Sequence, residues 1–183
     1  KIIEWTNHEK EIINYYNTNK IIACLNAPSH YSELINNFIN ENNINKKIVT
    51  ITLRQSSFNK SKNSNIKSWE EFYFYLLEKN YFPIILDDFE NYSINHISND
   101  KFYKYYFANS DIRVRLALYE KSFLNLGVIS GPMALNMYSK KSNFIIFKHL
   151  DLNPKSSSSH EANLNLSGLD STKNEQYPFH SLT

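Results

Sequence analysis

Glycine, arginine and cysteine are all scarce in this sequence of 183 residues. It holds three glycines, three arginines and one cysteine, against 26 asparagines and 17 lysines. The single cysteine, Cys24, excludes an internal disulfide and predicts a reducing compartment, which we take to be the cytoplasm. No apolar run approaches the roughly 18 residues that a membrane span requires. The composition therefore excludes a disulfide scaffold and predicts no membrane span.

Several catalytic and metal-binding signatures are missing as well. The sequence has no G-x-S-x-G nucleophile turn, no Walker phosphate loop and no G-x-G-x-x-G dinucleotide turn. Its six histidines are scattered, without metal-ligand spacing among themselves or with Cys24, so we predict no zinc site. The formal net charge of +2 does not indicate binding to nucleic acid or to a membrane surface.

Apolar and aromatic residues are present in quantity. They make up 42% and 15% of the chain, which predicts a folded globular domain. The excess of Asn, Lys, Ile, Tyr and Phe indicates AT-rich coding, under which an ordinary surface cation becomes lysine. The three remaining arginines, Arg54, Arg113 and Arg115, are therefore candidates for a chemical role such as bidentate anion binding.

The chain alternates between apolar runs and amphipathic stretches. We predict strands at 47–54, 81–88, 127–130 and 143–148, and helices at 8–17, 28–43, 68–79, 111–124 and 131–139. The strands are mostly apolar throughout, which predicts a parallel sheet flanked by helices, an α/β and Rossmann-like fold. We place this domain at 46–150. It follows an N-terminal helical segment at 1–45, which we interpret as the end of a preceding domain or a linker. A polar tail or loop at 151–183 comes after it.

Polar residues stand where the predicted strands end. Arg54 ends the first strand and the acidic pair Asp87 and Asp88 ends the second. Open α/β sheets bind ligands beyond the carboxyl ends of their strands. We expect Arg54 either to clamp a phosphate or to pair with one of the two aspartates. The acidic pair either opens a loop or holds a divalent cation.

The third strand leads into Ser130-Gly131-Pro132-Met133. Glycine allows a ligand to approach the backbone, and proline suits the first turn of a helix. Amides at the start of that helix would favour an anion such as pyrophosphate. The alternative is a plain tight turn before a buried helix. The other nearby glycine, Gly127, is expected to end the preceding helix in a left-handed cap.

Two arginines and one glutamate fall within the predicted helix 111–124. Arg113 and Arg115 are two residues apart, so they cannot share a helix face. We expect Arg115 to point into the cleft and Arg113 to lie at the surface or pair with Asp111. Glu120 either binds a pair of ribose hydroxyls or is a solvated helix carboxylate.

The order of these pieces resembles bacterial glycosyltransferases of the GT-B type, in their nucleotide-sugar-binding half. The pieces are residues 50–54, 63–72, 84–88 and 115–132, and the resemblance covers roughly residues 45–150. It implies two Rossmann-like domains with a donor cleft between them, and no required metal or cofactor. A complete enzyme of this kind is much longer, so we expect the chain to be one half, a fragment or a reduced relative.

The resemblance also implies roles for particular residues. Arg54 would contact the donor diphosphate, Ser130, Gly131 and Pro132 would bind phosphate, and Glu120 would hold the ribose. The function expected is transfer of a sugar from a nucleotide-sugar donor, to a glycan or lipid-linked acceptor. Two alternatives stay open: a nucleotide-sugar epimerase or related sugar-nucleotide enzyme, and a non-catalytic α/β interaction module.

Overall fold

The computed structural model describes residues 8–19, 24–57, 60–89 and 102–148. Two compact units divide the chain. One spans Cys24–Phe147, and the other combines the two ends of the chain, with helix α1 (His8–Asn19) as its described part. The larger unit begins before the predicted boundary at residue 46, because helix α2 (Ser29–Glu41) packs against helix α5 (Ile112–Lys121). The predicted tail at 151–183 lies outside the described residues.

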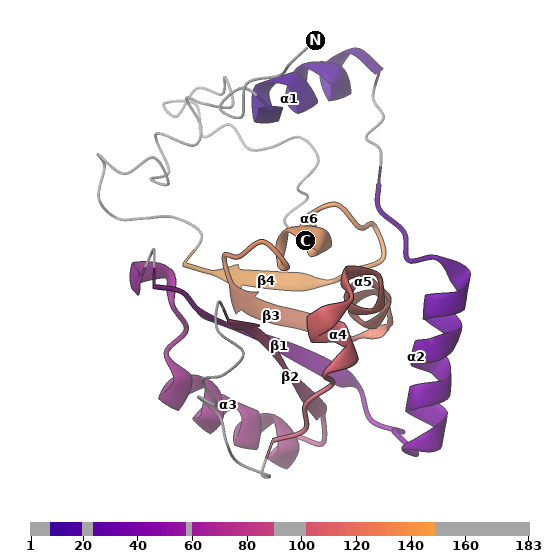
Figure 1. Cartoon of the computed structure of the whole chain (residues 1–183), viewed down its shortest axis with the longest axis vertical. Coiled ribbons are helices and arrows are strands. Elements are labelled where there is room, and N and C mark those ends of the chain that lie inside the picture. The colour runs from indigo at the N-terminus through magenta and orange to yellow at the C-terminus, as the bar shows by residue number, and fades with distance from the viewer. Residues whose placement is uncertain (1–7, 20–23, 58–59, 90–101, 149–183) are drawn as a thin grey trace. The chain divides into compact units, whose positions relative to one another are not determined.

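The larger unit is built on a four-stranded, all-parallel sheet, which confirms the predicted fold class. Its strands are β1 (Ile48–Gln55), β2 (Phe82–Phe89), β3 (Leu124–Val128) and β4 (Phe144–Phe147). Their order is β2-β1-β3-β4, which can be followed in Figure 1 from β2 up to β4. The chain adds β2 on one side of β1 and then crosses to add β3 on the other. The sheet therefore has a topological switch point between β1 and β3.

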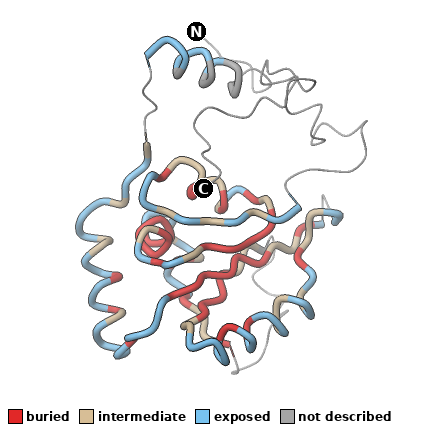
Figure 2. Tube along the Cα trace, turned by 180° about the vertical axis from the view of Figure 1, so that it is seen from behind, coloured by how far each residue is buried: buried red, intermediate tan, exposed pale blue. Residues whose placement is uncertain are grey.

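Helices cover the sheet on both faces, as the apolar strands predicted. Helix α3 (Ile66–Glu78) packs Tyr73 and Leu76 against Val49, Ile51 and Leu53 of β1. The opposite face is covered mainly by α2 and α5. The buried side chains of that second core include Ile35, Phe38, Val114, Leu118, Tyr119, Ile84 and Leu86. Burial is concentrated in the central strands and α5, while α2, α3 and β4 are largely exposed (Figure 2).

The exposed edge of β2 is partly closed by the residues that follow position 101. The amide of Ile85 donates to the carbonyl of Tyr103 at 2.9 Å, and Lys104 forms a parallel bridge with Ile85. The hydroxyl of Tyr73 on α3 accepts from the amide of Tyr103 at 2.9 Å. This segment then leads through α4 (Phe107–Ser110) into α5.

Several local predictions were wrong. β3 begins at Leu124 instead of 127, and α5 ends at Lys121, so Gly127 lies inside a strand and caps no helix. Helix α3 begins at Ile66 instead of residue 68, and its N-cap is Asn65, whose side chain accepts from the amide of Ser68. Helix α6 is short, spanning only Ala134–Met137.

Candidate functional site

Arg54 and the turn after β3 lie side by side at the switch point of the sheet. Arg54 is near the carboxyl end of β1, and its Nη1 donates to the carbonyl oxygen of Ile129 at 3.0 Å. Ile129 directly precedes Ser130 and Gly131. The sheet therefore brings together two of the features predicted from the sequence, across 75 residues of chain.

The backbone of Arg54 is held by the loop that follows β1. Ser64 accepts from the Arg54 amide through Oγ at 2.9 Å, and the Ser64 amide donates to the Arg54 carbonyl at 2.9 Å. Asn63 and Ser56 exchange two further hydrogen bonds, of 2.9 and 3.0 Å. The structure shows that the loop folds back to fix the position from which the guanidinium projects.

Asp88 lies opposite Arg54 in the register of β1 and β2. Side chains of opposed residues in paired strands project from the same face, so this carboxylate shares the sheet face of Arg54. Ion pairs in the described part of the chain join Asp87 to Lys104 and Asp111 to Arg113, and Arg54 takes part in neither. The predicted alternative of an Arg54–aspartate ion pair is therefore not what the structure shows.

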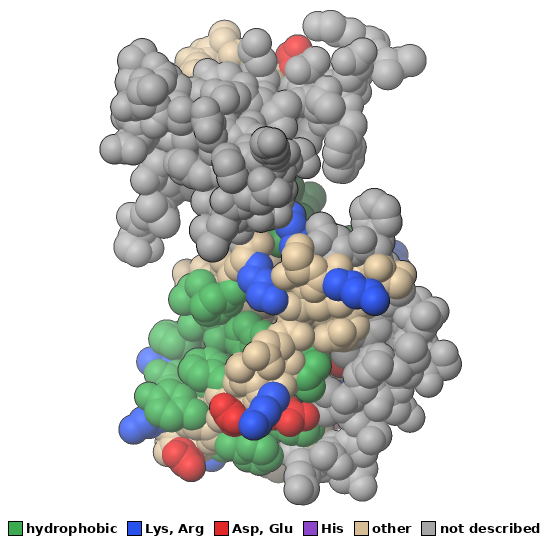
Figure 3. All heavy atoms as spheres, turned by 90° about the vertical axis from the view of Figure 1, so that its left-hand side faces the viewer, with side chains coloured by type: hydrophobic (Ala, Val, Ile, Leu, Met, Phe, Trp, Pro, Cys, Tyr) green, Lys and Arg blue, Asp and Glu red, His purple; other side chains and the backbone are tan. Residues whose placement is uncertain are grey.

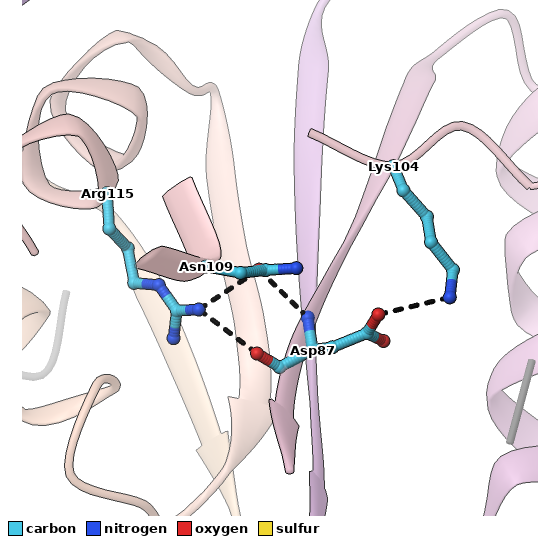
Figure 4. Close-up of polar contacts among 4 residues, drawn as sticks. All are labelled: Asp87, Lys104, Asn109 and Arg115. Atoms are coloured by element: carbon cyan, nitrogen blue, oxygen red, sulfur yellow. Dashed lines mark hydrogen bonds and ion pairs between the residues drawn. The ribbon is translucent and has the colours of Figure 1, made fainter. Parts of the chain in front are cut away.

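Asp87 points to the opposite face from Asp88, because successive side chains of a strand alternate. Its Oδ2 accepts from Lys104 Nζ at 3.0 Å, and both side chains are almost buried, at 13% and 11% exposed. Figure 4 shows Lys104 reaching Asp87 from the segment beside β2. Asp87 and Asp88 therefore do not form one joint acidic site. Across the described ranges, no group of three or more His, Cys, Asp or Glu is placed to hold a metal ion.

Arg115 is buried at 3% exposure and holds α4 and α5 to the end of β2. Its Nε donates to the carbonyl of Ala108 at 2.6 Å. Its Nη2 donates to the carbonyl of Asp87 and to Asn109 Oδ1, each at 3.1 Å (Figure 4). Asn109 Oδ1 also accepts from the Asp87 amide at 3.1 Å. Nη1 is buried without a partner among the described residues. Arg115 thus has a structural role, with one donor left over.

The turn at residues 130–133 combines an orphaned hydroxyl with an open glycine. Ser130 is 8% exposed, and its Oγ has no hydrogen-bond partner in the described structure. Gly131 is exposed, and a Cβ placed there would meet no atom within 4 Å. Pro132 is half-buried and Met133 is buried. Ser130 and Gly131 therefore remain the residues of this turn best placed to meet a ligand.

The expected cradle of helix-start amides is not supported. The amide of Ala134 bonds back to the carbonyls of Ser130 and Gly131, and that of Leu135 to Pro132. The next amide, of Asn136, donates to Met133. A helix of a single turn also has little macrodipole. These three amides are therefore not available to an anion, and the side-chain donors at this edge are those of Arg54 and Ser130.

Glu120 lies near the other end of α5, away from Arg54. Its Oε1 accepts from the amide of Ala27 at 3.1 Å and from Ser139 Oγ at 2.9 Å. Helix α5 starts near the carboxyl end of β2 and leads to the amino end of β3, so its last turn sits at the amino edge of the sheet. The structure thus uses Glu120 to tie α5 to the chain before α2 and the chain after α6, and does not bring it to the predicted site.

Buried hydroxyls and amides beneath the site were missed by sequence reasoning. Thr52 Oγ1 and Tyr119 Oη are hydrogen-bonded at 2.7 Å, and Thr50 Oγ1 donates to Asn125 Oδ1 at 2.7 Å. Burial raises the pKa of the Tyr119 phenol, and the nearby positive charge of Arg115 opposes that rise. The only signal in the sequence was the threonines at alternate positions of an otherwise apolar strand.

Arg113 lies at the surface and also pairs with Asp111, the two positions expected for it from the sequence. Its Nη2 is 2.7 Å from Asp111 Oδ2, and its guanidinium lies over the ring of Tyr31. Asp111 is also the N-cap of α5 and accepts from the Arg113 amide. The hydrogen bonds from Arg113 lower the pKa of Asp111 to about 2.

Comparisons with known proteins found no matching family model, no matching curated protein and no matching solved structure. In the part of the chain that the structure describes, no helix is both long and apolar enough to cross a bilayer.

Proposed function

We propose that the chain binds a nucleotide-sugar donor at the carboxyl edge of its sheet, and that it is a glycosyltransferase or the donor-binding part of one. The observation that carries this proposal is the 3.0 Å hydrogen bond from Arg54 to the Ile129 carbonyl. It places a guanidinium directly beside the Ser130-Gly131 turn at the switch point. Ligands of open α/β sheets bind at such a point.

The donor set at this edge suits a diphosphate. A guanidinium is a planar fork of donors that matches phosphate oxygens, and Arg54 uses only Nη1 in its bond to the described chain. Ser130 supplies a buried hydroxyl that has no hydrogen-bond partner among the described residues. Buried polar groups are normally hydrogen-bonded, so an orphaned hydroxyl at the edge of a ligand site supports a role in binding.

Such a site would act on the leaving group of the transfer. When the bond from sugar to diphosphate breaks, negative charge develops on the departing oxygen. Arg54 would stabilise that charge electrostatically without accepting or donating a proton. Asp88, on the same sheet face, is a carboxylate that could accept hydrogen bonds from hydroxyls of the donor.

Thermal unfolding with added nucleotides tests this proposal. We would measure the melting temperature of the chain with UDP, GDP, CMP or ADP, with and without Mg²⁺ or Mn²⁺. A ligand at 100 times its dissociation constant stabilises the native state by about 2.7 kcal/mol. We expect one nucleotide to raise the melting temperature without a metal ion.

Two arginine variants sharpen the test. Arg54→Ala should abolish the stabilisation by nucleotide, whereas Arg113→Ala, which removes the same charge from an exposed residue outside the site, should retain it. If no nucleotide stabilises the folded chain, or if Arg54→Ala responds like the wild type, the proposed site is wrong. If the chain binds a nucleotide but neither transfers the sugar of the matching nucleotide sugar nor hydrolyses it, a non-catalytic module is favoured instead.

A further inference from the structure

The edge strand β4 leaves apolar side chains uncovered on the face of the sheet that α3 occupies. Ile145 is 48% exposed and Phe147 is 46% exposed, although they belong to a parallel sheet. Parallel sheets occur almost only with both faces covered. Helix α3 contacts β2 and covers the middle of the sheet, so this part of the face needs another partner.

Helix α3 presents a row of aromatic rings beside the same strand. Trp69 packs edge-on against Phe147, with ring centroids 5.4 Å apart, and also against Phe72 at 6.1 Å. Phe72 in turn stacks with Tyr75 at 5.8 Å. Phe72 and Tyr75 are 36% and 49% exposed. We refer to Trp69, Phe72, Tyr75, Ile145 and Phe147 together as the α3–β4 surface.

We propose that the α3–β4 surface is covered by a second copy of this chain, in a two-fold symmetric dimer. The surface contains both parts of such a contact: a helix with outward aromatic rings, and a strand whose Ile145 and Phe147 no helix of the described residues covers. A two-fold rotation lays the helix of each copy on the uncovered strand of the other, so one patch completes itself. A helix from a different protein would cover β4 but would leave the outward aromatic rings of α3 exposed to solvent.

The charges that border the surface are complementary under this rotation. Helix α3 carries Glu70, Glu71 and Glu78 against one lysine, whereas the exposed Lys140 and Lys141 precede β4. Figure 3 shows hydrophobic side chains gathered on one face, with basic and acidic side chains next to them. Glu78 ends α3 at the amino edge of the sheet, where β4 begins. An axis parallel to the strands would bring Glu78 of each copy to the lysines of the other.

The size of the surface predicts a weak dimer. A whole aromatic side chain buries about 200 Å², so each half-exposed residue of the surface contributes roughly 100 Å². Four such residues in each of two copies give roughly 800 Å², below the area of a standard interface and in the range of transient ones. We therefore expect self-association at micromolar concentrations or above.

Sedimentation velocity of the 183-residue chain, from about 5 to 200 µM, tests the proposal in the range of weak interfaces. The weight-average mass should rise towards twice the monomer mass. Phe147→Lys should keep the chain monomeric throughout, while Phe107→Lys, at a position on α4 that is 68% exposed, should leave the association unchanged. Circular dichroism would establish that both variants are folded.

A charge reversal identifies the second copy as the occupant. Glu78→Lys alone should weaken association at least several-fold, and adding Lys141→Glu should restore it. A single monomer mass at all concentrations would overturn the proposal, whether another segment of the chain or a foreign protein covers the surface. Equal effects of Phe147→Lys and Phe107→Lys would overturn it as well.

Discussion

Replacing Gly127 by alanine should destabilise the larger unit, because no room exists for a methyl group at this position. A Cβ there would lie 2.9 Å from Met133 Sδ, 3.0 Å from Met133 Cγ and 3.0 Å from the Thr52 carbonyl oxygen. Met133 is fully buried, and the Thr52 carbonyl belongs to the central strand β1. The Met133 side chain is flexible but enclosed by the core, and the Thr52 carbonyl can yield only if the backbone of β1 shifts. Overpacking of this kind costs about 1–3 kcal/mol.

The nearby Gly131 is the matched control, since a Cβ would meet nothing there and its backbone lies outside the left-handed region. Gly131→Ala should be neutral or stabilise by up to about 1 kcal/mol, because alanine restricts the unfolded chain. Urea unfolding of the two variants measures the difference. A loss of about 2 kcal/mol in Gly127→Ala corresponds to roughly 4–8 °C in melting temperature.

Two outcomes would refute this reasoning. Gly127→Ala could be as stable as the wild type, or Gly131→Ala could be equally destabilised. The same pair also informs on the proposed site. If a phosphate approaches the backbone at Gly131, Gly131→Ala should weaken nucleotide binding while leaving the stability of the free protein intact.

Three further perturbations have defined outcomes. Lys104→Ala leaves the almost buried Asp87 carboxylate without its cation, so it should lower the free energy of unfolding by about 3 kcal/mol, measured with urea. The double variant Asp87→Asn with Lys104→Met should recover part of that loss. Asn125→Ala removes a buried amide that bonds a strand, a helix and a turn, and should cost at least about 1–3 kcal/mol for the groups left unpaired. The pKa of Asp111 is lowered from 3.8 to about 2, so its contribution to stability is present above pH 3.8 and is lost as the pH falls through 2. Arg113→Ala should return this pKa towards its ordinary range, measured by carboxyl NMR titration, and an unchanged titration would contradict the role of the Arg113 hydrogen bonds.

The element types and the parallel sheet could be predicted because they depend on local patterns. Uniformly apolar runs such as residues 81–88 indicate strands buried on both faces, and amphipathic stretches such as 68–79 indicate the helices that cover them. The prediction that Arg54 and the turn after β3 lie at one edge of the sheet also came from this pattern, since parallel strands end at a common edge.

The roles of individual polar residues depended on contacts between distant parts of the chain. Glu120 is engaged by Ala27, 93 residues away, and no local pattern could indicate that partner. Arg115 was expected in the cleft because arginine is scarce, yet its guanidinium is enclosed by carbonyls that only the packing of α4 against β2 brings near. Asp87 and Asp88 are neighbours in sequence, and the alternation of the strand sends them to different faces.

The sequence by itself determined the α/β class, the parallel strands and the three arginines that merited attention, because hydrophobic periodicity and composition are local properties. Only the tertiary structure decided what each residue does. It assigned Arg113 to the surface, Arg115 to the interior and Arg54 to the switch point. It placed Gly127 against Met133 inside the fold, because side-chain contacts depend on how the helices cross the sheet.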